Sequence, residues 1–201
     1  MRKKDLPKVK KVASTLLPTV YGDFTFDVFE DAQGREHIVL SAGNIKKNDP
    51  LLLRIHSSCI TSEIFLSGKC DCRGQLLKAM KIISEKGGAI IYLQEEGRGI
   101  GLTNKIRAYK LQAGGLDTVE ANEALNFPAD LRDYGVAISI LAVLGKKRVK
   151  LLTNNPAKVK ALEGRGIKVV EQLPLEVPPT RSNKGYLLVK KNKLGHRLKI
   201  R

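Results

Sequence analysis

Polar and apolar residues alternate through the first part of the chain, and longer apolar runs follow. Residues 23–30 alternate, which predicts a half-buried strand. Residues 31–34 are typical of a turn, and residues 36–40 then predict the returning strand. The run 51–55 predicts another strand, and the run 89–93 is apolar throughout, as expected of a buried central strand.

Helical spacing appears further along the chain. The segment 74–86 places its apolar residues on one face, and two glycines follow it as a stop signal. Asp130 resembles the start of a capping box for a long helix that reaches Leu144. The remaining predicted elements are helices from Gly101 to about Gln112 and from Pro156 to Gly164, and strands over 148–152 and 167–170.

Strands that alternate with helices favour an α/β fold in a single domain. The antiparallel start makes the predicted sheet mixed, with helices packed on it. No segment resembles a linker that would divide the chain. We expect a basic N-terminal arm over residues 1–12, a catalytic domain over 13–180 and a basic C-terminal segment over 181–201.

The two ends of the chain carry most of its formal net charge of +16, which arises from 36 basic and 20 acidic residues. Residues 1–12 hold six Lys or Arg against one Asp, and residues 181–201 hold eight against none. This distribution favours solvated basic ends, with a nucleic-acid surface as the alternative. Aromatic residues make up only 5% and Trp is absent, so nucleic acid is not expected as a partner.

The composition also bears on location. The apolar runs are far shorter than the ~18 residues that a membrane span needs, so no membrane segment is expected. The N-terminus is basic but lacks the apolar region of a signal peptide. Three cysteines without a disulfide framework fit a reducing cytoplasm.

All three cysteines, Cys59, Cys70 and Cys72, fall within fourteen residues. Three soft ligands at this spacing suit one Zn²⁺, and three protein ligands leave the fourth tetrahedral position for a water that ionises near pH ~7. We expect a short strand with turns here, with the ligands on loops. A disulfide is disfavoured by the odd count and by the closeness of Cys70 and Cys72. A closed structural site with His56 as fourth ligand, or three inert buried thiols, are the alternatives.

Two junctions between strands and helices are candidates for anion binding. The glycines of residues 97–101 allow backbone N–H groups to converge before a helix, and Arg98 adds a cation; a tight turn is the alternative. Glu95 and Glu96 beside this loop suit Mg²⁺ or the donor edge of a base. Residues 153–158 form the second junction, whose plainer interpretation is a helix N-cap.

Taken together, several motifs resemble those of the GTP cyclohydrolase II family, from about Leu17 to His196. They are Arg54-Ile-His-Ser, the C-x10-C-x-C spacing, Glu96-Gly-Arg-Gly-Ile-Gly-Leu102, Asn104-Lys-Ile-Arg-Ala-Tyr109, Asp117-Thr-Val-Glu-Ala-Asn122, Asp130-x-Arg132-x-Tyr134, Leu151-Leu-Thr-Asn-Asn-Pro156, and Asn183-x-x-Tyr-Leu with Lys193-Leu-Gly-His196. The stand-alone form is expected, since the chain leaves no room for the dihydroxybutanone phosphate synthase domain of bifunctional riboflavin enzymes.

The resemblance implies the first step of riboflavin biosynthesis, in which GTP and water give formate, pyrophosphate and a 2,5-diamino-6-ribosylamino-pyrimidinone 5′-phosphate. It implies attack of zinc-bound hydroxide on guanine C8, release of pyrophosphate assisted by Mg²⁺, and a homodimer. The alternatives are a relative that stops at the formamidopyrimidine product and a zinc-stabilised nucleic-acid-binding protein. A nucleobase deaminase is disfavoured because its zinc motifs are absent.

The same resemblance assigns roles to particular residues. Cys59, Cys70 and Cys72 would bind zinc, Arg132 would act as nucleophile or as cation at the α-phosphorus with Asp130 as its partner, and Tyr109 would serve the ring-opening sequence. Contacts to GTP would come from Arg54, Ile55, His56, Ser57, Ser58, Gln75, Glu96, Gly97, Arg98, Thr118, Thr153 and Lys158. The chain departs from the family at Ser58, often Glu, and at Glu95, often Gln.

Overall fold

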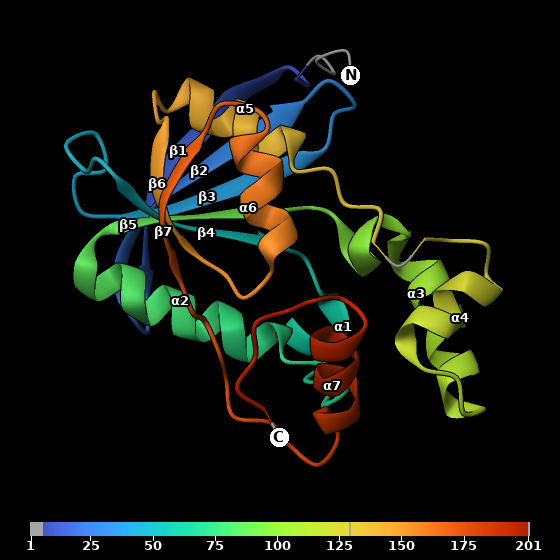
Figure 1. The fold of residues 1–201 in the computed structure, drawn as a ribbon. Coiled ribbons are helices and arrows are strands. Elements are labelled where there is room, and N and C mark those ends of the chain that lie inside the picture. The colour runs from blue at the N-terminus through green and yellow to red at the C-terminus, as the bar shows by residue number, and fades with distance from the viewer. Residues whose placement is uncertain (1–5, 129, 201) are drawn as a thin grey trace. The chain divides into compact units, whose positions relative to one another are not determined.

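The computed structural model describes residues 6–128 and 130–200 (Figure 1). The predicted α/β class with a mixed sheet is confirmed. In the described part of the chain one sheet has the strand order β1-β2-β3-β5-β4-β6-β7. Its strands are β1 (Val9–Thr19), β2 (Gly22–Asp31), β3 (Glu36–Ala42), β4 (Leu51–Ser57), β5 (Gly88–Leu93), β6 (Arg148–Leu152) and β7 (Lys168–Leu173).

The contacts of the chain divide it into two compact units. Unit 1 contains the described part of Met1–His56, together with Leu76–Gln94 and Tyr134–Leu175. Unit 2 contains Ser57–Gln75 and the described parts of Glu95–Asp133 and Glu176–Arg201. The boundaries predicted for the arm, the catalytic domain and the C-terminal segment stay predictions.

The sheet of unit 1 is antiparallel on one side and parallel on the other. β1 pairs with β2, β2 with β3 and β3 with β5, all antiparallel, so the predicted antiparallel N-terminal part is present. β6 pairs in parallel with both β4 and β7. Parallel neighbours bring the carboxyl ends of β4 and β6 to the same edge, where ligands of open α/β sheets bind.

Helices pack on both faces of this sheet (Figure 1). On one face α5 (Gly135–Val143) and α6 (Pro156–Glu163) bury apolar side chains against Val39, Leu53 and Ile91. On the other face α2 (Cys72–Lys86) packs through Ala79 and Ile83 onto Phe24, Ile90 and Leu152. Because apolar side chains are buried on both faces, the sheet is a stable element that positions the loops at its edge.

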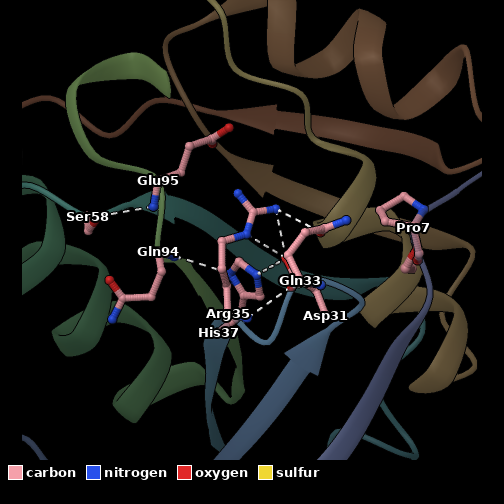
Figure 2. Close-up of polar contacts among 9 residues, drawn as sticks. Pro7, Asp31, Gln33, Arg35, His37, Ser58, Gln94 and Glu95 are labelled. Atoms are coloured by element: carbon pink, nitrogen blue, oxygen red, sulfur yellow. Dashed lines mark hydrogen bonds and ion pairs between the residues drawn. The ribbon is translucent and has the colours of Figure 1, made fainter. Parts of the chain in front are cut away.

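The hairpin of β2 and β3 carries a buried polar cluster (Figure 2). His37 and Asp31 are 2% and 4% exposed, and the His37 Nε2 lies 3.2 Å from Asp31 Oδ2. The backbone N–H of Gln94, one residue past β5, donates to His37 Nδ1 at 3.2 Å. Since Nδ1 accepts this bond, the neutral ring carries its proton on Nε2 and donates to Asp31.

Unit 2 is mainly helical. Its elements are α1 (Ile60–Glu63), the first turn of α2, the 3₁₀ helix η1 (Glu96–Gly99), α3 (Gly101–Ala113), α4 (Thr118–Ala124) and α7 (Lys184–Asn192). Asp117 caps α4 with a capping box that includes Glu120, because its carboxylate accepts from two backbone N–H groups and the Glu120 carboxylate accepts from the Asp117 N–H.

Two predicted elements are wrong in this part of the chain. The helix predicted from Asp130 begins at Gly135 instead. Asp130 accepts hydrogen bonds from the backbone and side chain of Arg132, and the Leu131 N–H donates to the Arg98 carbonyl at 3.1 Å, so these groups serve a loop. The cysteine segment contains the short helix α1 where a short strand was expected.

The charged ends also differ in part from solvated tails. Strand β1 begins at Val9, so residues 9–11 of the expected arm pair with β2 and Val12 lies at a register shift, whereas residues 1–5 lie outside the described residues. The C-terminal segment forms α7, which the sequence pattern did not predict. No helix among residues 6–128 and 130–200 is long and apolar enough to span a membrane.

Candidate functional site

Three thiols from separate elements meet in unit 2. Cys59 precedes α1, Cys70 lies in the following turn, and Cys72 is the first residue of α2. Their Sγ atoms all lie within 4.8 Å of one another, and those of Cys59 and Cys70 are 3.7 Å apart. A tetrahedral zinc with bonds of ~2.3 Å has S–S edges of ~3.8 Å. The three cysteines therefore fit one zinc ion.

A buried lysine faces this thiol group. Lys105 on α3 is 8% exposed, and its Nζ donates to Cys59 Sγ at 3.1 Å and to Glu96 Oε1 at 2.7 Å. Hydrogen bonds from Cys70 and Cys72, and the charge of Lys105, lower the pKa of the Cys59 thiol against the opposing effect of burial. A thiolate is the form that binds metal. Sequence reasoning gave Lys105 no role.

Glu96 connects the glycine loop (residues 97–101) to the metal segment, which is the stretch of residues 59–72 that holds the three cysteines. Its Oε2 accepts from the Ile60 N–H at 2.8 Å, and its Oε1 accepts from the Gly97 N–H at 3.0 Å. Gly97 and Arg98 both have left-handed backbone angles, with φ of +64° and +59°. A Cβ at Gly97 would stand 3.2 Å from the Cβ of Lys105, so glycine permits this close approach. The loop is thus held beside the thiols.

Tyr109 lies one helical turn after Lys105 on α3. Its ring centroid is 5.7 Å from the Lys105 Nζ and 5.2 Å from the Lys69 Nζ. Burial raises the pKa of Tyr109 to about 12, although a hydrogen bond with Thr61 and the charge of Lys105 oppose the shift. At neutral pH the phenol is therefore protonated and can donate its O–H.

Asp130 and Arg132 form a close ion pair in the loop before α5. Burial tends to raise the pKa of Asp130, but the hydrogen bonds and charge of Arg132 outweigh it, so the pKa is lowered and the carboxylate is ionised at neutral pH.

Glu95, also in unit 2, contacts both predicted serines. The Glu95 N–H donates to Ser58 Oγ at 3.1 Å, and the Ser57 hydroxyl donates to the Glu95 carboxylate at 3.4 Å. Burial raises the pKa of Glu95 against the effect of Arg132.

The two other predicted substrate residues of unit 2 lie on helix starts. The Gln75 Nε2 donates to Asp71 Oδ2 at 2.6 Å in the first turn of α2. Thr118 is the first residue of α4, directly after its cap Asp117. Asp117 also forms an ion pair with Lys193, which follows α7.

The remaining predicted residues gather at one edge of the unit 1 sheet. Arg54 on β4 donates from Nη1 to the Leu152 carbonyl at 3.0 Å. Lys158 on α6 is 4% exposed, and its Nζ donates to the Ile55 carbonyl at 2.7 Å. Thr153 follows β6, and its hydroxyl accepts from the Asn155 N–H at 3.1 Å. The carboxyl ends of β4 and β6 thus hold these residues together.

His56, the alternative fourth ligand, has its own neighbours in unit 1. Its Nδ1 lies 3.4 Å from Arg54 Nη2, and its ring stacks on Tyr92 with centroids 5.7 Å apart. Within the described residues of unit 2, no carboxylate or histidine joins the three thiols. At the junction 153–158, for which a helix N-cap was the plainer interpretation, Asn155 caps α6 by accepting from the Ala157 N–H.

The fold and site define an α/β protein with three thiols that could hold a metal ion beside a glycine loop. The model of the family described as GTP cyclohydrolase II matches residues 10–174 of this chain, and the chain belongs to that family. The resemblance to this family is thereby confirmed.

Curated relatives agree with the family model. The chain is 53% identical to a GTP cyclohydrolase-2 of Shewanella sediminis over 190 residues, covering 94% of this chain and 93% of that protein. It is 54% identical to a GTP cyclohydrolase-2 of Neisseria meningitidis over 186 residues, covering 92% and 94%. It is 51% identical over 191 residues to the riboflavin biosynthesis protein RibBA of Aquifex aeolicus, covering 94% of this chain and 47% of that protein.

Proposed function

We propose that this chain hydrolyses GTP, opening the imidazole ring of guanine to release formate and pyrophosphate and leave the diaminopyrimidinone phosphate of riboflavin biosynthesis. The observation that carries the proposal is the zinc-compatible spacing of Cys59, Cys70 and Cys72 in a member of the GTP cyclohydrolase II family. The high identity to proteins named GTP cyclohydrolase-2 over nearly their whole length supports it.

The three cysteines would hold one Zn²⁺, which supplies a water of lowered pKa as nucleophile for the guanine ring. The chain's own residues prepare that place. Lys105 offsets the negative charge of the thiolates and binds Glu96, so the glycine loop stays beside the metal segment. Tyr109, as a neutral phenol, would donate a proton to a nitrogen of the opening ring.

Arg132 and Asp130 would act on the phosphate side of the substrate. Because Asp130 is ionised and bound to Arg132, the pair favours a guanidinium that stays charged and stabilises the phosphoryl transition state. A neutral arginine nucleophile is costly, since the pKa of a guanidinium exceeds ~12. We propose Mg²⁺ as a second cation that neutralises the departing pyrophosphate.

The cationic residues of unit 1 fit contacts to a triphosphate. Arg54 on β4 contacts the last carbonyl of β6, and Lys158 on α6 contacts the Ile55 carbonyl of β4. Both side chains therefore lie near the carboxyl ends of two neighbouring parallel strands, the usual ligand edge of an α/β sheet. Charge-assisted bonds from such groups to phosphate oxygens are among the strongest polar contacts in proteins. We also propose a homodimer and a cytoplasmic location, the latter because free thiols fit a reducing compartment.

The proposal is tested by incubating the purified protein with GTP and Mg²⁺ and following three products separately. Formate, pyrophosphate and the pyrimidine chromophore are expected in equal amounts. Pyrophosphate with a formamidopyrimidine and without formate would instead support the relative that stops early. Ammonia release would indicate a deaminase, and salt-dependent nucleic-acid binding with no turnover of GTP would indicate the binding protein; either result would contradict the proposal.

A further inference from the structure

Helix α7, drawn in red in Figure 1, begins beyond residues 10–174, the segment that the family model matches. It belongs to the segment whose charge predicted a solvated basic end. Two of its side chains, Lys190 and Tyr186, nevertheless contact the candidate site within unit 2. Through these contacts α7 can influence the positions of residues in the candidate site.

Lys190 makes a buried ion pair with Asp71 of the metal segment. Its Nζ donates to Asp71 Oδ1 at 2.7 Å, and the two residues are 8% and 6% exposed. Asp71 lies between Cys70 and Cys72, so its carboxylate is part of the turn that sets the positions of two thiols. A buried carboxylate is strongly destabilising without its partner, and the pair therefore fixes this turn.

The same carboxylate also orients a predicted substrate contact. Asp71 Oδ2 accepts a hydrogen bond from Gln75 Nε2 at 2.6 Å. One oxygen of Asp71 thus binds Lys190 and the other binds Gln75. If the Asp71 carboxylate rotates after the loss of Lys190, the Gln75 amide loses the hydrogen bond that sets its orientation.

Tyr186 extends the contact from α7 to the glycine loop. The Lys190 Nζ lies 4.7 Å from the centroid of the Tyr186 ring. The Tyr186 hydroxyl accepts a hydrogen bond from Arg98 Nη2 at 3.3 Å, and the Arg98 guanidinium lies 5.7 Å from the same ring. Arg98 has a left-handed backbone, a strained state that its surroundings must maintain.

We propose that Lys190 is a positioning residue, which through Asp71 holds two zinc-binding cysteines and Gln75, and through Tyr186 supports Arg98. Helix α7 is then a structural part of the reaction site. The effect on GTP rests on the proposed function, whereas the effect on zinc binding does not. Outer contacts of this kind alter metal affinity or activity by about 10- to 100-fold.

The test compares full-length Lys190→Met, Lys190→Arg and the matched control Lys184→Met, which removes the same charge from an exposed position of α7. Zinc affinity is measured by competition with a chromophoric chelator, and KM and kcat with GTP. We expect Lys190→Met to weaken zinc binding and raise KM, each by about tenfold or more. Lys190→Arg should recover most of both, and Lys184→Met should resemble the wild type.

A double variant separates positioning from stability. Asp71→Asn added to Lys190→Met removes the uncompensated buried carboxylate, so the melting temperature should return toward that of the wild type. The raised KM and the weakened zinc affinity should persist. Wild-type zinc affinity and KM in Lys190→Met, or their full recovery together with the melting temperature, would overturn the proposal. If the wild type lacks GTP turnover, the proposed function fails and the zinc affinities alone decide this inference.

Discussion

Lys105 shows how one buried cation relates the metal segment to the glycine loop. Its ammonium contacts both the Cys59 sulfur and the Glu96 carboxylate. Burial would lower the pKa of Lys105, but Glu96 and the Cys59 thiolate outweigh it and raise the pKa, so the side chain is charged at neutral pH. Three thiolates and one zinc would leave a net charge of −1, which this cation would offset.

We expect Lys105→Met to lower zinc affinity by about 10- to 100-fold, because Cys59 then lacks its charged donor. Lys105→Arg should lose less, and Lys110→Met, an exposed lysine on the same helix, should lose nothing. Competition with a chelator measures the affinity. In the cobalt-substituted protein, the thiolate-to-metal charge-transfer band should shift in Lys105→Met. Unchanged affinity and absorption would show that Lys105 only fills space.

Residues adjacent in sequence were predictable, and residues brought together by the fold were not. The three cysteines crowd into fourteen positions, so their spacing alone indicated a metal site. Lys105 lies 46 residues from Cys59, and no local pattern marks it. The same holds for Lys190, which lies 119 residues from Asp71.

The β2–β3 hairpin links the fold to acid stability through its buried cluster (Figure 2). Burial would raise the pKa of Asp31, yet hydrogen bonds from Arg35, His37 and the Gln33 backbone lower it to about 2. Burial lowers the pKa of His37 against the attraction of Asp31. In both cases the unfolded chain binds protons more readily than the folded chain, so acid favours unfolding.

We expect the free energy of unfolding to be largest above pH ~6.5, to decline as His37 titrates, and to lose about 2 kcal/mol more between pH ~4 and ~2 as Asp31 is protonated. Urea unfolding across this range measures it. Asp31→Asn should be less stable at neutral pH and lack the lower part of the decline. The exposed control Glu36→Gln should follow the wild type. Parallel curves for wild type and Asp31→Asn would contradict this assignment.

At the level of elements, periodicity predicted most strands of the sheet and the helices that pack on it, but it misplaced the start of α5. Asp130 has the residue type of an N-cap, but its carboxylate is used by Arg132, so the chain stays a loop until Gly135. Helix α7 was obscured by its lysines, which were interpreted as solvated charge although Lys190 is buried.

For the whole molecule, the sequence predicted an α/β fold with a mixed sheet, and the structure agrees. The grouping of the chain into two units was not predictable, because each unit is assembled from three separate segments. The charge of the ends was similarly ambiguous, since β1 takes part of the N-terminal arm into the sheet as an exposed strand and α7 buries Lys190 of the C-terminal segment.

The central claim is that one zinc on three sulfurs serves the hydrolysis of GTP, and a metal titration tests it most directly. Apo-protein prepared with a chelator receives zinc in steps, and formate release from GTP is followed with Mg²⁺ in excess. The rate should rise linearly and level off at one zinc per chain, and Cys70→Ser should stay near zero throughout. Full formate release without zinc, or wild-type release by Cys70→Ser, would contradict the account.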